Sequence, residues 1–105
     1  MALARTINTD IAMRNDRLRT SIPRISKPDL CVITKGIADM SVDDQVEIMT
    51  IVKEYTAFND DNDPWGEHDF GSFYYNLIKM FWKIDNYAGD QGLRLVLTIL
   101  LADEY

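Results

Sequence analysis

Cysteine, histidine and long apolar runs are scarce in this chain of 105 residues, and each scarcity excludes a class of protein. Cys31 stands alone, which excludes an intrachain disulfide, and its apolar neighbours in "DLCVIT" favour a small buried side chain over a nucleophile. One histidine and one cysteine are too few for a closed zinc site. No stretch approaches the roughly 20 apolar residues that span a bilayer, and the first ten residues lack the apolar core of a secretory signal. We therefore expect a protein of the bacterial host cytoplasm.

Positive charge is also scarce, and it gathers at one end of the chain. The sequence has 11 Lys and Arg against 17 Asp and Glu, which gives a net charge of −6. Residues 1–35 hold seven basic and three acidic side chains (+4), whereas residues 36–105 hold four and fourteen (−10). An acidic body repels nucleic acid and attracts basic surfaces. The simpler alternative is that the negative charge only keeps the protein soluble.

The hydrophobic content of 47% suits a folded globule, and the length suits one domain over residues 1–105. Residues 1–28 are expected to form a basic N-terminal helix, from Asn8 or Thr9 to about Thr20, and a proline-containing connection. Residues 29–105 are expected to form an acidic α+β body. Its first element is the short apolar run 30–34, which is typical of a strand.

Hydrophobic spacing predicts the remaining elements. A helix begins after Ser41, and its inward face is predicted to carry Val42, Val46, Met49, Val52 and Tyr55. The runs 72–76 and 77–85 predict two strands joined near Asn76, and the alternation over 78–85 indicates that one face of the second strand is buried. The run 93–102 is apolar nearly all round, which predicts a buried closing helix. The order αβα-ββ-α indicates an α+β fold, a small antiparallel sheet of about three strands packed against about three helices.

The most unusual segment is "NDDNDPWGEHDFGSF", residues 59–73, with five carboxylates, the only histidine and two glycines. A calcium loop of the EF-hand type does not fit, because position 5 counted from Asp61 is Trp65 and position 12 is Ser72. A looser Mg²⁺ or Mn²⁺ site stays open, with four candidate carboxylates: Asp61, Asp63, Glu67 and Asp69. Acid–base catalysis also stays open, with Glu67, His68 and Asp69 as the reacting groups.

A purely structural role explains the same segment. Asp and Asn side chains accept backbone N–H groups in turns, and proline and glycine supply the backbone conformations that turns need. Trp65, Phe70 and Phe73 can anchor the loop to the core. His68 would then hydrogen-bond carbonyls or carboxylates and lock the segment before the hairpin.

Three motifs resemble a bacterial family known as domain of unknown function 3768. They are "DNDPWGEHDFGSF" at 61–73, "FWKIDNY" at 81–87 and "RLVLTILLADEY" at 94–105, and the resemblance covers about residues 30–105. Members typically read DNDPxGEHDFGxF, FWKIDYYD and VLTIMLAEEY, so Asn86 and Ala88 depart from the pattern, and the polar segment before the last element is shortened to "AGDQG". The resemblance implies no reaction. Members look like accessory proteins of phages, plasmids and integrated elements, which implies a counter-defence role.

We therefore predict a small acidic, non-enzymatic interaction protein of the phage or mobile-element kind, an anti-CRISPR or anti-restriction inhibitor. Fixed carboxylates would imitate the phosphates of a nucleic acid and bind a basic nucleic-acid-binding surface on the partner. The predicted binding residues lie on and around the helix after Ser41: Asp39, Asp43, Asp44, Glu47, Glu54, Asp60, Asp61 and Asp63. No cofactor, direct nucleic-acid contact or membrane contact is expected, and the protein would be a monomer or a small homo-oligomer.

Two alternatives complete the sequence-based hypotheses. The first is a metal-dependent or acid–base enzyme that uses the cluster Glu67, His68 and Asp69. The second concerns four arginines of the N-terminal part: Arg14, Arg17, Arg19 and Arg24. They could touch RNA or DNA, pair with the acidic body or mediate self-association.

Overall fold

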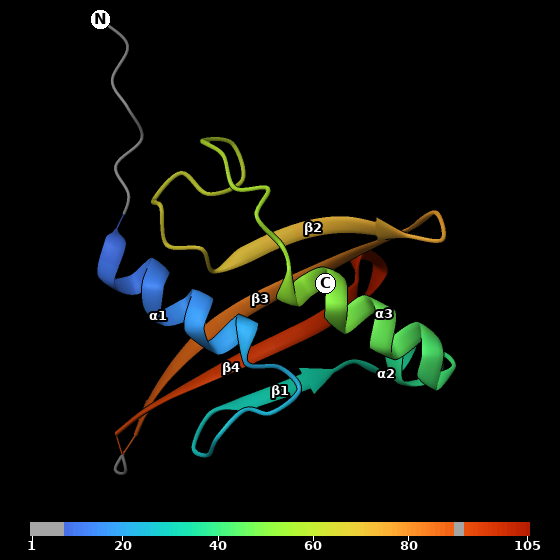
Figure 1. Cartoon of the computed structure of the whole chain (residues 1–105), viewed down its shortest axis with the longest axis horizontal. Coiled ribbons are helices and arrows are strands. Elements are labelled where there is room, and N and C mark those ends of the chain that lie inside the picture. Colours follow the sequence, from blue (N-terminus) through green and yellow to red (C-terminus); the bar gives the residue numbers. More distant parts are fainter. Residues whose placement is uncertain (1–7, 90–91) are drawn as a thin grey trace, which may run out of the picture.

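The computed structural model describes residues 8–89 and 92–105. Its elements in chain order are α1 (Thr9–Thr20), β1 (Leu30–Ile33), α2 (Lys35–Ala38), α3 (Val42–Lys53), β2 (Phe70–Tyr75), β3 (Ile78–Gly89), β4 (Gly92–Leu101) and the 3₁₀ turn η1 (Ala102–Glu104). The four strands form one sheet in the order β1-β4-β3-β2, in which β1 and β4 are parallel and the other pairs antiparallel. Helices α1 and α3 lie across the same side of this sheet (Figure 1). The α+β class predicted from the sequence is confirmed.

Alternate residues of the two central strands build the core. Trp82 pairs with Ile99, and Ile84 pairs with Leu97, so these side chains share one face of the sheet. Both strands are buried at these positions, and Ile48 and Val52 of α3 pack on them with Leu18 of α1. Burial of this apolar surface is the main favourable term in folding. It fixes α1 and α3 over the sheet.

The segment predicted as a closing helix is a strand, which is the main correction to the sequence-based fold. Leu93–Leu101 belongs to β4, which pairs with β1 on one side and with β3 on the other. A strand in the middle of a sheet and buried over most of its length reads as a continuous apolar run, so its period of two is hidden. The sheet therefore has four strands, and the chain ends in a short 3₁₀ turn.

Helix α3 begins where it was expected, but it is rotated relative to the predicted inward face. Ser41 caps it by accepting the N–H of Asp44 at 3.1 Å. Val42 and Val46, predicted to face inward, are 74% and 57% exposed, and Ile48, which was not predicted, is fully buried. The prediction is confirmed for Val52 and Tyr55, which are buried. Apolar side chains cover a broad arc of this helix, so spacing alone admits two faces, and packing on the sheet selects the one that carries Ile48.

The hairpin between β2 and β3 confirms the predicted pair of strands. Its two connecting residues, Asn76 and Leu77, have φ values of 48° and 65°. Positive φ at both central positions is the requirement of the two-residue turn whose twist matches the flanking strands. Among the described residues, no helix is long and apolar enough to cross a membrane.

Candidate functional site

The acidic segment between α3 and β2 starts with a turn that its own side chains hold. The side-chain oxygen of Asn59 accepts the N–H groups of Asp61 and Asn62 at 2.8 and 3.0 Å. Asn62 returns a bond by accepting the N–H of Asn59, and its amide donates to the carbonyl of Ala57 at 2.7 Å. These are the local bonds for which asparagine is favoured in turns. They need no partner molecule.

Asp63 anchors the second half of the segment from inside the protein. Only 3% of its surface is exposed, and its Oδ1 accepts the N–H groups of Glu67 and His68 at 3.0 and 3.1 Å. Its carbonyl accepts the N–H of Gly66, which has a φ of 64° that glycine adopts without a steric cost. Asp63 therefore organises the turn and does not belong to the exposed acidic surface predicted from the sequence.

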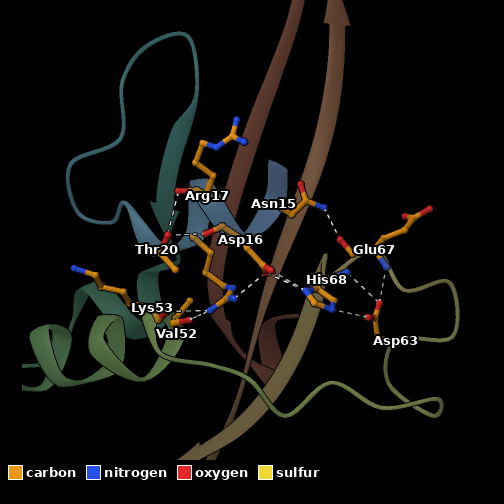
Figure 2. A network of polar contacts seen from close by, with 10 residues as sticks. Asn15, Asp16, Arg17, Thr20, Val52, Lys53, Asp63, Glu67 and His68 are labelled. Carbon is orange, nitrogen blue, oxygen red and sulfur yellow. Dashed lines mark hydrogen bonds and ion pairs between the residues drawn. The ribbon is translucent and has the colours of Figure 1, made fainter. Parts of the chain in front are cut away.

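His68 lies between two carboxylates (Figure 2). Its Nδ1 is 3.0 Å from both carboxylate oxygens of Asp16, and its Nε2 is 3.6 Å from Oδ2 of Asp63. The imidazole also stacks on the Phe58 ring, with centroids 3.8 Å apart and planes 1° from parallel. Both ring nitrogens and one ring face are thus occupied by groups of the protein itself.

The contacts of His68 extend to α1 and the end of α3. Asp16 accepts a bond from Nη2 of Arg19 at 3.0 Å, and Nη1 of Arg19 donates to the carbonyls of Val52 and Lys53 at 2.8 and 3.0 Å. Asn15 donates from its side chain to the carbonyl of Glu67 at 2.9 Å. We call the five side chains that make these contacts the clamp network: Asn15, Asp16, Arg19, Asp63 and His68. It ties α1 to the acidic segment and to the last turn of α3.

The predicted catalytic cluster does not converge. The carboxylate of Glu67 points away from His68, and Glu67 joins the clamp network only through its backbone (Figure 2). Burial raises the pKa of Asp69, as do the nearby carboxylates of Asp63 and Asp85. Within residues 8–89 and 92–105, neither Glu67 nor Asp69 hydrogen-bonds to His68. These three neighbours in sequence therefore face different surroundings.

The same part of the chain gives no support to the magnesium or manganese alternative. Over the described residues, no group of three or more His, Cys, Asp or Glu side chains lies close enough to hold a metal ion. Asp61 is exposed at the loop surface. Asp63 is buried, and its carboxylate accepts backbone N–H groups and lies 3.6 Å from Nε2 of His68. The four candidates Asp61, Asp63, Glu67 and Asp69 are close in sequence but do not form a cage.

Most of the other predicted acidic residues do lie on the surface. Asp39, Asp43, Glu47, Glu54, Asp60 and Asp61 are exposed, and Asp44 is half-buried. The Tyr75 hydroxyl lies 2.6 Å from Oδ1 of Asp44 and 2.7 Å from Oε2 of Glu47, which fixes two carboxylates side by side on α3. The bond from Tyr75 lowers the pKa of Asp44, and both carboxylates raise the pKa of Tyr75. We call the seven exposed or half-buried carboxylates named in this paragraph the acidic surface.

Trp65 contradicts the expectation that it anchors the loop to the core. Its side chain is 77% exposed, while Phe73 packs against the core and the ring of Phe70 lies 5.2 Å from that of Phe81. Single exposed apolar residues are common on protein surfaces, and Leu77 and Tyr105 of this chain are exposed as well. Trp65 nevertheless offers a large apolar contact point in the same loop as Asp60 and Asp61.

The sequence-based hypotheses missed the part that α1 plays in this site. Asn15 and Arg19 are both buried, on the same helical face as Ala12 and Leu18. That spacing of three and four residues was available in the sequence and would have placed both polar side chains on the inward face. Asp16 carried no such signal, because its partner His68 lies 52 positions further along.

Comparison with known proteins places the central part of this chain in a family. The sequence profile of a family described as "Protein of unknown function (DUF3768)" matches residues 33–95. The match includes the motifs at 61–73 and 81–87, and it excludes α1. No curated protein and no solved structure matches the chain.

Proposed function

Since the chain belongs to the DUF3768 family, whose function is unknown, we propose a role from its surface: it is a small acidic, non-enzymatic interaction protein. The acidic surface on α3 and the loop after it binds a basic, nucleic-acid-binding surface on a partner protein. The partner is a host defence complex of the CRISPR or restriction kind, in the bacterial cytoplasm. That last step rests on the resemblance to accessory proteins of mobile elements and not on the geometry.

The observation that carries this proposal is the fixed pair of carboxylates on α3. Asp44 and Glu47 both lie within hydrogen-bond distance of the Tyr75 hydroxyl, which donates its one proton to either carboxylate, so the two charges have a defined spacing before any partner arrives. Groups that are already ordered lose less conformational entropy on binding than free side chains do. An ordered row of carboxylates can replace phosphates on a basic surface and release their counterions.

Exposed Trp65 strengthens the interaction hypothesis. Tryptophan is enriched among the few interface residues that contribute most of the binding free energy, because it buries a large area at a small entropic cost. Charged residues alone give fast association but little residence time. The acidic surface would thus steer the partner, and Trp65 would hold it.

The proposal is tested by charge reversal on the acidic surface with a matched control. The variant Asp43→Lys/Glu54→Lys changes two exposed residues of that surface, and Asp10→Lys/Asp103→Lys changes two exposed carboxylates outside it. Each pair changes the net charge from −6 to −2, so an effect of total charge alone would be equal in the two variants. We expect only the first pair to abolish inhibition of DNA binding by purified CRISPR surveillance or restriction complexes.

Salt dependence and Trp65 give two further readouts. Binding through exposed carboxylates should weaken strongly between about 0.1 and 1 M salt, because the Debye length shrinks from about 10 to 3 Å. Trp65→Ala should shorten the lifetime of the complex more than it slows association. Inhibition that survives high salt, or equal effects of the two charge-reversal pairs, would rule out recognition by the acidic surface.

One observation favours the enzyme alternative, namely the raised pKa of Asp69 next to His68 in the sequence. Perturbed carboxylates are common in active sites, although buried charge networks perturb them too. If Glu67, His68 and Asp69 catalyse a reaction, Glu67→Gln and His68→Ala must abolish it while the melting temperature stays nearly unchanged. The clamp network predicts instead that His68→Ala mainly destabilises the protein.

A further inference from the structure

A hollow of about 210 Å³ lies between α1, the connection after it and the start of β4. Three arginines line it: Arg14, Arg17 and Arg24. Two hydroxyl side chains, Ser21 and Ser26, line it as well, and Leu18, Ile25 and Leu95 supply apolar wall. Its single acidic residue is Asp29, whose carboxylate accepts the N–H of Leu95 at 2.8 Å. The hollow therefore holds three positive charges against one negative charge.

The three arginines of this hollow form no ion pair with a carboxylate in the described part of the chain. Within residues 8–89 and 92–105, the guanidinium groups of Arg17 and Arg24 make neither an ion pair nor a hydrogen bond. Arg14 donates only to the neutral amide oxygens of Asn15 and Asn86. Among the described residues, Arg17 and Arg24 are therefore available to an external anion, and Arg14 keeps its full charge because its hydrogen-bond partners are neutral.

Arg19 marks the difference between a structural and an available arginine. Arg19 lies on α1, as Arg14 and Arg17 do, but it is 3% exposed. It donates to Asp16 and to two carbonyls at the end of α3. The sequence grouped Arg19 with Arg14, Arg17 and Arg24. The structure separates it from them and leaves a set of three around one hollow.

We propose that this hollow binds a phosphate group. The planar fork of a guanidinium matches two phosphate oxygens at once, and several such forks around one hollow are typical of phosphate recognition. The hydroxyls of Ser21 and Ser26 offer further donors at its wall. The site is positively charged, whereas the acidic surface is negatively charged, and the two share no residue. The proposal of a phosphate site is therefore independent of the proposed function.

A second hollow, of about 720 Å³, is not part of this site. Arg94 and Tyr87 line it and pair across β4 and β3, whereas Leu95 lines the phosphate hollow. Side chains of consecutive strand residues point to opposite faces of a sheet, so Arg94 and Leu95 belong to different surfaces. The proposed site is therefore the smaller hollow alone, and its ligand is a phosphate group, free or attached to a larger molecule.

Binding of phosphate is tested with three probes on the full chain: inorganic phosphate, adenosine monophosphate and a ten-residue oligothymidylate. The variant Arg17→Gln/Arg24→Gln removes the two unpartnered charges, and Lys53→Gln/Lys79→Gln removes two exposed charges elsewhere. We expect the arginine pair to weaken binding at least about tenfold, since each charge-assisted hydrogen bond to phosphate is strong. The lysine pair should leave binding unchanged.

The probes also distinguish the source of the phosphate. If inorganic phosphate and adenosine monophosphate bind, and the oligothymidylate does not displace them, the natural ligand is a free phosphate or nucleotide. If the oligothymidylate binds, the logarithm of its association constant should fall with that of salt with a slope of about −2, because three contacts to a single strand contribute about 0.7 each. Either result supports a phosphate site.

Nuclear magnetic resonance on the unaltered protein protects the test against a variant that fails to fold. Phosphate should shift the side-chain Nε–H signals of Arg14, Arg17 and Arg24 and leave that of buried Arg19 in place. Failure of all three probes to bind at millimolar concentration would overturn the proposal. So would wild-type affinity in the arginine variant, or shifts confined to residues outside the hollow.

Discussion

At the scale of single residues, Asp63 holds the acidic segment together from inside the protein. Its carboxylate accepts two backbone N–H groups and lies near His68, whose other nitrogen contacts Asp16. The sequence identified Asp63 and His68 as special through their turn-rich surroundings. Their partners could not be predicted, because Asp16 lies about half the chain away and only the docking of α1 brings it near.

Replacement of Asp63 should therefore cost far more stability than replacement of a neighbouring carboxylate. Asp63→Ala leaves two part-buried N–H groups without their acceptor and His68 without a nearby carboxylate, and we expect a loss of about 2–4 kcal/mol in the free energy of unfolding. Asp61→Ala, at an exposed position of the same loop, should change stability by less than about 0.5 kcal/mol. Urea denaturation of both variants measures the difference. Equal losses would show that the segment is not organised by Asp63.

Replacement of Asp69 should stabilise the protein, whereas replacement of Asp63 destabilises it. The gain should depend on pH, because the pKa of Asp69 is raised. Because the folded protein binds this proton more tightly than the unfolded chain, the ionised carboxylate opposes folding at neutral pH. This cost falls as the pH drops through the raised pKa, and it is gone below the ordinary value of 3.8. Asp69→Asn should accordingly be more stable than the wild type at pH 7 and equal to it near pH 3.8. Thermal unfolding across this range decides, and a less stable variant at pH 7 would contradict the assignment.

At the scale of elements, the structure shows what hydrophobic spacing can and cannot specify. The hairpin β2–β3 was predicted because Met80, Trp82 and Ile84 alternate with Phe81, Lys83 and Asp85, of which two are charged, so one face of the strand is visible in the sequence. The alternation is lost in β4, where Leu100 is buried like Leu97 and Ile99. A run that is buried on both faces looks the same in a strand and in a buried helix, which is why residues 93–102 were predicted as a helix.

The connection of α1 to α3 is another element-scale feature that the sequence did not predict. The guanidinium of Arg19 donates to the carbonyls of Val52 and Lys53 in the last turn of α3, where the Val52 carbonyl also accepts the N–H of Tyr55 at 3.3 Å. It also lies 5.2 Å from the Trp82 ring and 5.6 Å from the Phe58 ring. A positive charge at the carboxyl end of a helix is favourable, so one side chain caps α3 and docks α1.

The turn of the hairpin offers a stabilising substitution. Leu77 has a φ of 65°, in the left-handed region that side chains with a Cβ resist, and it is 96% exposed, so it packs against little. Leu77→Gly should therefore raise the free energy of unfolding by about 0.5–1 kcal/mol, the relieved strain less the added entropy of the unfolded chain.

Asn76→Gly is the matched control for this turn. Asparagine tolerates a left-handed conformation, so the change at φ 48° should be close to neutral. Chemical denaturation of both variants gives the comparison. A gain at Asn76 as large as that at Leu77 would mean that strain at Leu77 is not the cause.

At the scale of the whole molecule, the clamp network joins the part of the chain that matches the family to a helix outside the match. The match covers residues 33–95, which include α3, the acidic segment and β2–β3, whereas α1 lies outside it. Glu67 and His68 of the matched part nevertheless contact α1, through Asn15 and Asp16 respectively, and Asp63 accepts the backbone N–H groups of both. The segment that identifies the family is thus also the surface on which the basic helix docks, and the arginine-lined hollow lies on the other side of that helix's contacts, among Arg14, Arg17 and Arg24.

The position of β4 predicts where the molecule is most stable. It pairs with strands along both edges, while β2 has a neighbour on one edge only. Backbone amides in the middle of β4, from Leu95 to Ile99, should exchange their hydrogens only on global unfolding, and the outward amides of β2 should exchange sooner. Hydrogen exchange followed by nuclear magnetic resonance tests this order. Earlier exchange in β4 than in β2 would contradict the sheet order.

The central place of β4 also has a consequence for protein synthesis. A nascent chain that has reached Gly89 contains β1 and the β2–β3 hairpin, but not the strand that joins them. Its apolar core and two strand edges stay uncovered, a state that is prone to pairing with other chains. The protein should therefore fold only after residues 92–101 have left the ribosome, and ribosome-bound or prematurely terminated chains that lack them should be clients of chaperones.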